Sequence, residues 1–429
     1  MGLPQELVDQ IVDILRDDLR ALKACSLTCK AMFASTRHLI HQKLCLTERN
    51  SRSVLTQEEE QQLYRSLGNY LNLKLRFLPH MGERGLLQYT RHVHIAKGYM
   101  FTPGTLLPHL HYFQSLDQVH TLTIEQYNAP SWADHYNTCF VHFYPTLTSL
   151  TLSYPYGRYD PLLEFALQFP NLENLCLEWL PIKEGHIPYL APTAPVIFER
   201  SPPLRGHLRL AGYGTTSHES LAFDRLPKFN FRTVELEAFF GDRVQHTLNA
   251  CADTLEELTI VPLGSGKHLP PLLSLTMTNR SVGLLSTGDV QLRGFRLQRI
   301  NLLCRLTLRM EFRQVSTLKK DALIGVLSTI TSLVFSELVI ELGRLPPHFR
   351  GSTSDLWGSW REVDAHLQTR FTRYGGFKFV IRTGKLCDGG DFERHTKGSF
   401  PLLESMGRIQ FETDESIEKH WPPRSSDRT

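Results

Sequence analysis

The sequence lacks the features that mark several large classes of protein. Its 47 Lys and Arg nearly balance its 44 Asp and Glu, so the basic excess of a nucleic-acid-binding protein is missing. The longest uncharged apolar segment, residues 322–336, is too short to cross a bilayer. Neither a nucleic acid nor a membrane is therefore expected as a partner. With 41% hydrophobic residues in a chain of 429, the protein can bury a large core.

Cysteine is sparse, and its eight residues are widely spread with no CxxC pair. Most lie in apolar runs, a pattern that predicts buried free thiols in a reducing compartment. Cys25 and Cys29 are four residues apart and could share a helix face as metal ligands, but no second pair follows at metal-binding spacing. The first residues lack the basic region of a secretory signal, so a cytoplasmic location, a nuclear location or both are expected.

The motifs of common catalytic sites are also missing. No GxSxG, HExxH or GxGxxG occurs, and the GSGK segment at 264–267 lacks two required positions of a phosphate-binding loop. His92 and His94 alternate and therefore share one face of a strand, either as two metal ligands or as two ordinary strand histidines. We predict a protein that is not an enzyme, with no catalytic residue, metal or cofactor.

The first 47 residues are predicted to form three short helices. From residue 3 to 15, apolar side chains cover about half of the helix circumference, whereas a surface helix needs a stripe of only about 100°. Asp17 and Asp18 are predicted to begin a second helix that continues through Phe33, and a third is expected from Ser35 to Leu46. A bundle of this size buries little surface, so the surplus apolar face predicts docking, either onto the rest of the chain or onto another protein.

The order of residues in this segment resembles the F-box. The matching positions read LPxEL-x3-I-x3-L from residue 3, L-x2-CSLxCK from residue 22 and LxL from residue 44. The form ACSLTCK at 24–30 looks especially like the large F-box families of mushroom-forming fungi. This resemblance implies binding to the Skp1 adaptor, and through it to a cullin complex, by apolar anchors that pack into a groove of a helical partner. The implied contact residues are Leu3, Pro4, Leu7, Ile11, Leu15, Leu22, Cys25 and Leu27.

Behind a predicted helical connector at 48–88, a short motif recurs along the chain. It reads apolar, two residues, apolar, one residue, apolar, as in Leu147-x2-Leu150-x-Leu152, and each copy holds an alternating strand. Copies end at 124, 152, 177, 236, 260, 308, 340 and 411, and weaker ones end at 95, 210 and 379. Helical runs precede several of them, at 161–169, 242–251, 319–328 and 355–371.

The spacing of the first seven strand ends, 24 to 33 residues, resembles an irregular leucine-rich repeat array without the usual closing Asn. We therefore predict an α/β fold (α+β overall) in which the helical segment at 1–47 precedes a solenoid at 89–412 with parallel strands on its concave side. A Pro-rich loop is expected at 181–206, and the tail at 413–429 is predicted to be disordered.

Charged residues between the strand leucines point away from the predicted core. The middle of this surface is predicted to be acidic, which would favour a basic segment of a target protein, although a solvated polar sheet face has the same pattern. The residues are Glu125, Glu178, Glu235, Glu237, Glu257, Arg305 and Arg309, followed by Glu337 and Glu341.

Three functions fit these patterns. The first is a substrate-receptor subunit of a Skp1–cullin–F-box ubiquitin ligase, which binds the adaptor through its helices and an unidentified protein target through the repeats. The second is a scaffold for protein interactions, bound to Skp1 or free, with no role in ubiquitination. The third is an enzyme whose site lies within the repeat domain, which would require convergent titratable groups in a deep pocket.

Overall fold

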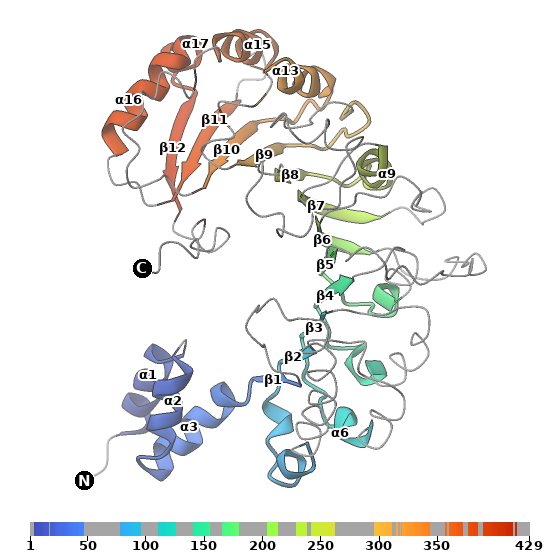
Figure 1. Cartoon of the computed structure of the whole chain (residues 1–429), viewed down its shortest axis with the longest axis vertical. Helices are drawn as coiled ribbons and strands as arrows, with labels where there is room; N and C mark the ends of the chain where they lie inside the picture. Colours follow the sequence, from blue (N-terminus) through green and yellow to red (C-terminus); the bar gives the residue numbers. More distant parts are fainter. Residues whose placement is uncertain are drawn as a thin grey trace, which may run out of the picture. The chain divides into compact units, whose positions relative to one another are not determined.

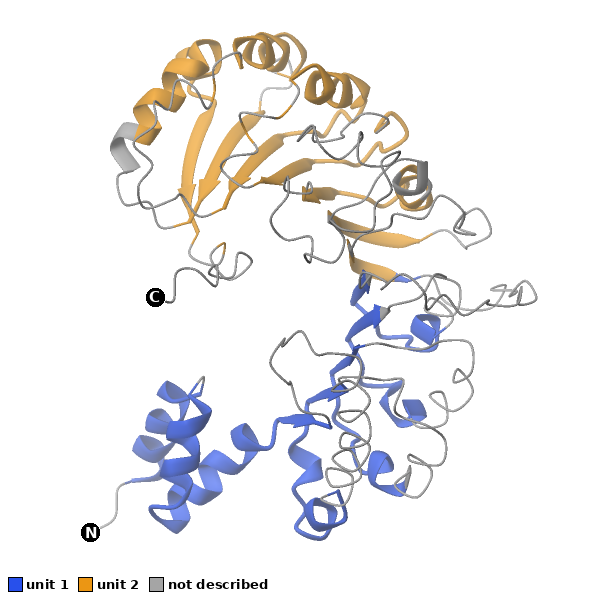
Figure 2. Ribbon diagram, viewed as in Figure 1, with its two compact units in different colours: residues 1–180, 188–204 blue, residues 181–187, 205–429 orange. Residues whose placement is uncertain are grey.

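The computed structural model divides into two compact units (Figure 2). Unit 1 contains Met1–Leu180 and Pro188–Leu204, and unit 2 contains Pro181–Ile187 and Arg205–Thr429. The structure describes residues 4–16, 18–46, 78–95, 110–125, 140–154, 165–179, 204–212, 229–237, 242–261, 296–310, 315, 318, 320–343, 357, 360–371, 376–384, 389–414 and 417.

Unit 1 begins with three helices, α1 (Gln5–Ile14), α2 (Leu19–Ser26) and α3 (Lys30–Ile40). The Asp18 carboxylate caps α2 by accepting the amides of Arg20 and Ala21 at 3.0 Å, as a capping Asp predicts. The predicted boundary between the second and third helices is wrong, because α2 ends at Ser26 and α3 already begins at Lys30. Cys29 caps α3 instead of lying on the same helix as Cys25, and its sulfur accepts the amide of Met32 at 3.5 Å.

The sheet of unit 1 starts within the segment predicted as the third helix. Its strands are β1 (Lys43–Cys45), β2 (His92–Ile95), β3 (Thr121–Glu125), β4 (Ser149–Tyr154) and β5 (Asn174–Trp179). Each pairs in parallel with the next along the chain. Leu44 and Leu46 alternate with more exposed residues, and both leucines are buried. Because β1 pairs in parallel with β2, this short segment forms a strand and not the end of the expected helix.

Unit 2 continues the same pattern with seven parallel strands. They are β6 (Arg205–Gly212), β7 (Asn230–Glu237), β8 (Glu257–Val261), β9 (Arg305–Met310), β10 (Glu337–Leu342), β11 (Lys378–Thr383) and β12 (Ile409–Thr413). Neighbours in sequence pair in register, apart from an irregularity at Gly206 and His207. The predicted α/β class with parallel strands is confirmed, and all eleven predicted strand motifs coincide with β2–β12.

Helices or short helical turns precede many of the strands. In unit 2, α9, α13, α15, α16 and α17 lie along one face of the sheet (Figure 1). The predicted helices at 242–251, 319–328 and 355–371 correspond to α9 (Asp242–Ala250), α13 (Lys320–Thr329) and the shorter α15 (Arg361–Phe371). Further helices and short helical turns include η1 (Leu87–Tyr89), α6 (Leu110–Gln114), η5 (Val141–Phe143), α16 (Gly389–Ser399) and α17 (Pro401–Ser405).

Two predicted loop segments differ from expectation at their ends. The Pro-rich loop lies outside the described residues as far as 203, but Arg205 already belongs to β6. Of the predicted tail at 413–429, Thr413 ends β12 and the side chain of Ile417 is buried, whereas residues 415, 416 and 418–429 lie outside the described residues. The predicted connector lies outside the described residues between 48 and 77, and residues 78–83 are helical.

Aromatic side chains fill the cores of both units. In unit 1, the ring of Phe140 packs against Phe113, Phe143 and Phe165 at centroid distances of 6.0, 5.4 and 6.3 Å. In unit 2, Phe400 contacts Trp357, Trp360 and Phe379 at 5.4, 5.8 and 4.8 Å. Rings at these distances stabilise the packing of neighbouring repeats beyond the area they bury.

The same pattern of backbone hydrogen bonds occurs just before several strands, and it links one helix–strand repeat to the next. A carbonyl just before one strand accepts two successive amides at the start of the following strand, as His120 does from Thr148 and Ser149 and as Cys304 does from Ser336 and Glu337. Hydroxyl groups add further bonds to the preceding repeat, including Thr146 to Val119, Thr254 to Phe231, Thr331 to Gln298 and Ser332 to Asn301, all at 2.8–3.0 Å. These bonds satisfy backbone groups that the turns would otherwise leave unpaired.

Among the described residues, no helix is long and apolar enough to serve as a membrane span.

Candidate functional site

Helix α1 carries two apolar stripes that point in different directions. Val8 and Val12 are buried at 2% exposure and form the contact with the rest of the bundle. Leu7 and Ile14 lie seven residues apart, which places them within about 20° of each other on the helix and away from the buried pair. Their side chains are exposed, Leu7 by 45% and Ile14 by 82%. The surplus apolar surface predicted from the sequence is therefore present on α1 and is exposed within the part of the chain that the structure describes.

Helices α2 and α3 add to the exposed apolar surface. Leu19 of α2 is exposed by 47%, Leu27 directly after α2 by 87% and Phe33 of α3 by 49%. Together with Leu7 and Ile14 they form a set of large apolar side chains that we call the bundle surface. Single exposed leucines are ordinary, but five within 27 residues indicate an interaction surface.

The eight contact residues that the resemblance implies differ in their exposure to solvent. Pro4, Leu7 and Leu27 are exposed, and Ile11, Leu15 and Cys25 are half-buried, so these six remain within reach of a partner. Leu22 has an exposure of 1% and belongs to the core of the bundle. Leu3 lies outside the described residues. Ile14, Leu19 and Phe33 were not selected from the sequence, although the heptad spacing of residues 7 and 14 would have identified Ile14.

A polar contact fixes α1 against α3. Ser35 Oγ donates to Asp9 Oδ1 at 2.7 Å, and Gln5 Nε2 donates to both Asp9 Oδ1 and Ser35 Oγ at 2.9 and 2.8 Å. The hydrogen bonds from Ser35 and Gln5 lower the pKa of Asp9, because they favour its charged form. This contact links α1 to α3 through exposed polar side chains.

Arg37 joins α3 to the residues that follow the bundle in unit 1. Its guanidinium lies over the rings of Phe33 and Tyr89 at 5.4 and 5.5 Å, and Nη2 donates to the carbonyl of Arg84 at 3.3 Å. The stacked guanidinium therefore holds the ring of Phe33 in place while about half of that side chain stays exposed.

The predicted target surface of unit 2 is built from ion pairs between strands, one of which reaches from β9 across β8 to β7. Arg309 Nη1 lies 3.0 Å from Glu235 Oε1, and Arg309 Nε lies 3.1 Å from Glu341 Oε2. Arg209 contacts the same Glu235 oxygen at 3.2 Å. The side chains of Arg309, Glu235 and Glu341 are only 14%, 12% and 6% exposed, so these charges are largely removed from water.

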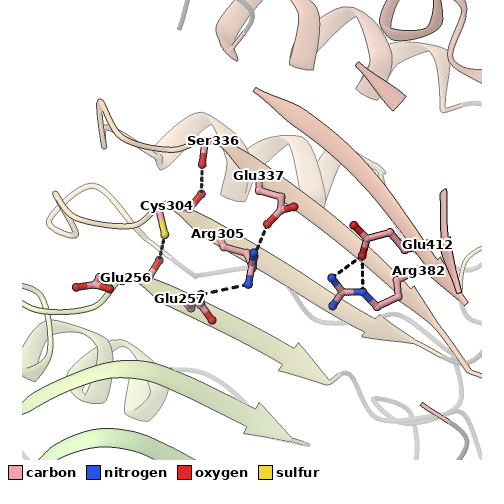
Figure 3. A network of polar contacts seen from close by, with 8 residues as sticks. All are labelled: Glu256, Glu257, Cys304, Arg305, Ser336, Glu337, Arg382 and Glu412. Carbon is pink, nitrogen blue, oxygen red and sulfur yellow. Dashed lines mark hydrogen bonds and ion pairs between the residues drawn. The ribbon is translucent and has the colours of Figure 1, made fainter. Parts of the chain in front are cut away.

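Two further groups of ion pairs lie on the same side-chain face (Figure 3). Arg305 pairs with Glu337 and, at 3.1 Å, with Glu257, and Arg382 Nη2 lies 2.7 Å from Glu412 Oε2. The paired side chains form what we call the charge ladder, which consists of Arg209, Glu235, Glu257, Arg305, Arg309, Glu337, Glu341, Arg382 and Glu412.

The charge ladder corrects the prediction of an acidic surface. Glu235 and Glu257 are paired with arginines from β6 and β9, so they do not present free negative charge. The sequence pattern could not show this, because Arg309 and Glu235 are 74 residues apart and meet only through the parallel strand order. The side chain of Glu237 lies outside the described part of the chain.

On the corresponding face of unit 1, the two predicted glutamates contact other polar side chains. His94 Nε2 lies 3.0 Å from Glu125 Oε1. Ser153 Oγ donates to Glu178 Oε2 at 2.9 Å, and Cys176 Sγ donates to Glu178 Oε1 at 3.7 Å. These contacts join glutamate to histidine, serine and cysteine, whereas those of the charge ladder join glutamate to arginine.

The cysteines of the described residues are less buried than predicted. Cys251 is buried, Cys29 is exposed, and Cys25, Cys45, Cys176 and Cys304 are half-buried, with none of the six in a disulfide. Within the described ranges, no cluster of three or more His, Cys, Asp or Glu side chains could hold a metal ion. Comparison of the chain with protein-family models and with curated protein sequences gave no match.

Proposed function

We propose that the protein is an F-box substrate receptor of a Skp1–cullin–F-box ubiquitin ligase, with a leucine-rich-repeat-like domain that binds a protein target. The exposed bundle surface carries this proposal, since four large apolar side chains on three helices, together with Leu27 directly after α2, provide the anchors that a helical partner requires. The residue order of the segment supports it independently.

Such a receptor needs no catalytic residue. One part of the chain would hold the ligase and another would hold the target, so that ubiquitin transfer becomes effectively intramolecular. The target would meet the sheet face of unit 2, where the charges of the ladder are already paired. Selectivity for a target would then depend on shape and apolar contact more than on net charge, because paired charges attract an opposite charge weakly.

The test is co-purification of the full chain with Skp1. We expect the variant Leu7→Asp/Ile14→Asp to recover at least tenfold less adaptor than wild type, because two carboxylates would enter an apolar contact. Ile14 is preferred to Ile11 as the second site, since Ile11 is half-buried and its substitution would also disturb the bundle.

A matched control is available in unit 2. Leu333 and Val334 are also exposed apolar neighbours, at 74% and 52%, so Leu333→Asp/Val334→Asp should leave adaptor recovery unchanged. Full recovery by a folded Leu7→Asp/Ile14→Asp chain, checked by circular dichroism, would contradict the proposal. Deletion of residues 1–47 separates ligase from scaffold, because target proteins should accumulate only if the chain directs their turnover.

A further inference from the structure

Three chemically complementary side chains lie at the carboxyl ends of the first three parallel strands. Cys45 is the last residue of β1, His94 is the third of four in β2, and Glu125 is the last residue of β3. Their neighbours Leu44 and Val93 are buried, so the alternation of a strand puts all three on the opposite, polar face. The carboxyl ends of parallel strands are where α/β proteins place reactive side chains.

The contacts connect the three groups in series. Cys45 is the register partner of His94 across the β1–β2 pair, and the two side chains are hydrogen-bonded. On the other side, His94 Nε2 lies 3.0 Å from Glu125 Oε1. The His94 side chain is 17% exposed, Glu125 is 43% exposed and Cys45 is half-buried, so all three side chains are partly open to solvent.

The electrostatics of the site favour a charged imidazole. Hydrogen bonds to Cys45 and then to Glu125 raise the pKa of His94 to about 9, against the opposing effect of its burial. Among the other described cysteines, burial raises the pKa of Cys251 to about 12 and also raises that of Cys304. An imidazolium beside a thiol stabilises the thiolate, and a carboxylate that holds the imidazole keeps it oriented and protonated.

We propose that Cys45 is a reactive thiolate, positioned by His94 and Glu125, that undergoes reversible exchange with low-molecular-weight disulfides. The Cys45 thiolate attacks one sulfur of the disulfide, a new S–S bond forms to Cys45, and the original S–S bond breaks. The departing thiolate takes a proton from solvent, and a second small thiol reverses the reaction. The disulfide supplies the oxidising equivalent, so no further co-reactant is required.

The experiment measures the rate at which oxidised glutathione modifies each cysteine of the intact chain, by mass spectrometry of the peptides between pH 6 and 8. Cys29 is exposed and serves as the internal reference thiol. An ordinary thiol with a pKa of about 8.5 is below 1% thiolate at pH 6, so its rate should rise about tenfold per pH unit. We expect Cys45 to react about tenfold faster than Cys29 at pH 6, with a nearly flat pH profile.

Variants distinguish a positioned thiolate from a merely accessible one. His94→Gln should lower the Cys45 rate at pH 6 to that of Cys29 and restore the tenfold rise per pH unit. His92→Gln is the matched control, since His92 lies on the same strand and face and should leave both rates unchanged. A wild-type Cys45 that is slower than Cys29, or that has the same pH slope, overturns the proposal whatever the variants do. Adaptor binding is not part of the measurement, so the result is independent of the proposed function.

Discussion

At the scale of single residues, the least exposed charges of the charge ladder are expected to affect the stability of unit 2 most. Arg309 stands between Glu235 and Glu341, with all three side chains less than 15% exposed. Removal of one partner from a buried ion pair leaves an uncompensated charge, which costs far more than the pair itself contributes. Arg382 and Glu412, which are 23% and 41% exposed, are open to solvent and lose little on separation.

We predict that Arg309→Met lowers the free energy of unfolding of unit 2 by about 3 kcal/mol. Arg382→Met should lower it by less than about 1 kcal/mol, because its partner is solvated. Both are measured by urea denaturation of the full chain. A triple variant, Arg309→Met/Glu235→Gln/Glu341→Gln, should recover part of the loss, and an equal loss in the two single variants would contradict this account of the ladder.

The pKa values of His92 and His94, two residues apart on β2, should differ widely. The pKa of His94 is about 9, whereas burial, together with the charges of Lys43 and His120, lowers the pKa of His92 below its ordinary value of 6.5. Because the folded-state pKa of His94 exceeds its unfolded value, its stabilisation is complete below about pH 6.5 and is lost as pH rises through about 9.

We predict that the ring resonances of His94 in an NMR titration have a midpoint near pH 9, and that those of His92 have a midpoint below 6.5. Cys45→Ser should move the His94 midpoint down, because the hydrogen bond to Cys45 is the largest contribution to its shift. Coincident midpoints for the two histidines in the wild-type chain would contradict the geometry of this site.

Sequence reasoning identified the residues of the bundle surface only in part. The F-box resemblance selected Leu7 and Leu27, which are exposed, but also Leu22, which is buried. Strand alternation selected Glu235 and Glu257 as outward-facing without showing that they are neutralised. The direction of a strand residue follows from local alternation, whereas its partner depends on which strand lies beside it.

At the scale of the helices and strands, one buried carboxylate connects two helices of unit 2. Asp364 of α15 is 1% exposed and accepts the amides of Leu402 and Leu403, at 2.8 and 3.0 Å, in the first turn of α17. Burial raises the pKa of Asp364, and the two amides oppose this effect. The residue that precedes α17, Phe400, has no side chain able to cap it, so Asp364 supplies the cap from another helix.

We predict that Asp364→Ala lowers the free energy of unfolding by about 2 kcal/mol, because two amides in the first turn of α17 would lose their acceptor. Asp364→Asn should cost less, since an amide oxygen still accepts one of these bonds. Glu362→Ala, at an exposed position of the same helix, should change stability by less than about 0.5 kcal/mol. Urea denaturation of the three variants measures the differences, and equal losses for Asp364→Ala and Glu362→Ala would exclude a capping role.

Element boundaries were less predictable than element types. The helix–strand repeat was predictable because each unit has its own apolar alternation, but the start of α3 at Lys30 was not, since Cys29 is an unusual cap. Strand β1 was mistaken for the end of a helix because three residues are too few to show a period. The hydroxyls of Thr254 and Ser332 bond to carbonyls of the preceding repeat and were not predictable, because Ser and Thr occur in every loop.

At the scale of the whole chain, the strand order was predictable and the chemistry of the polar faces was not. Strand motifs at regular spacing with intervening helices allow few arrangements other than sequential parallel pairing, and this is what both units contain. The clustering of charge pairs in unit 2, and of Cys45, His94 and Glu125 in unit 1, depends on register and could not be derived from single motifs.

The sequential pairing of strands also bears on how the chain is made. Within each unit, every strand after the first is hydrogen-bonded to the strand that precedes it in the sequence. When a strand emerges from the ribosome, the strand with which it pairs has therefore already been synthesised, so pairing does not require the carboxyl-terminal part of the chain. We expect each unit to grow outward during translation, one strand at a time, with little apolar surface left bare at any stage.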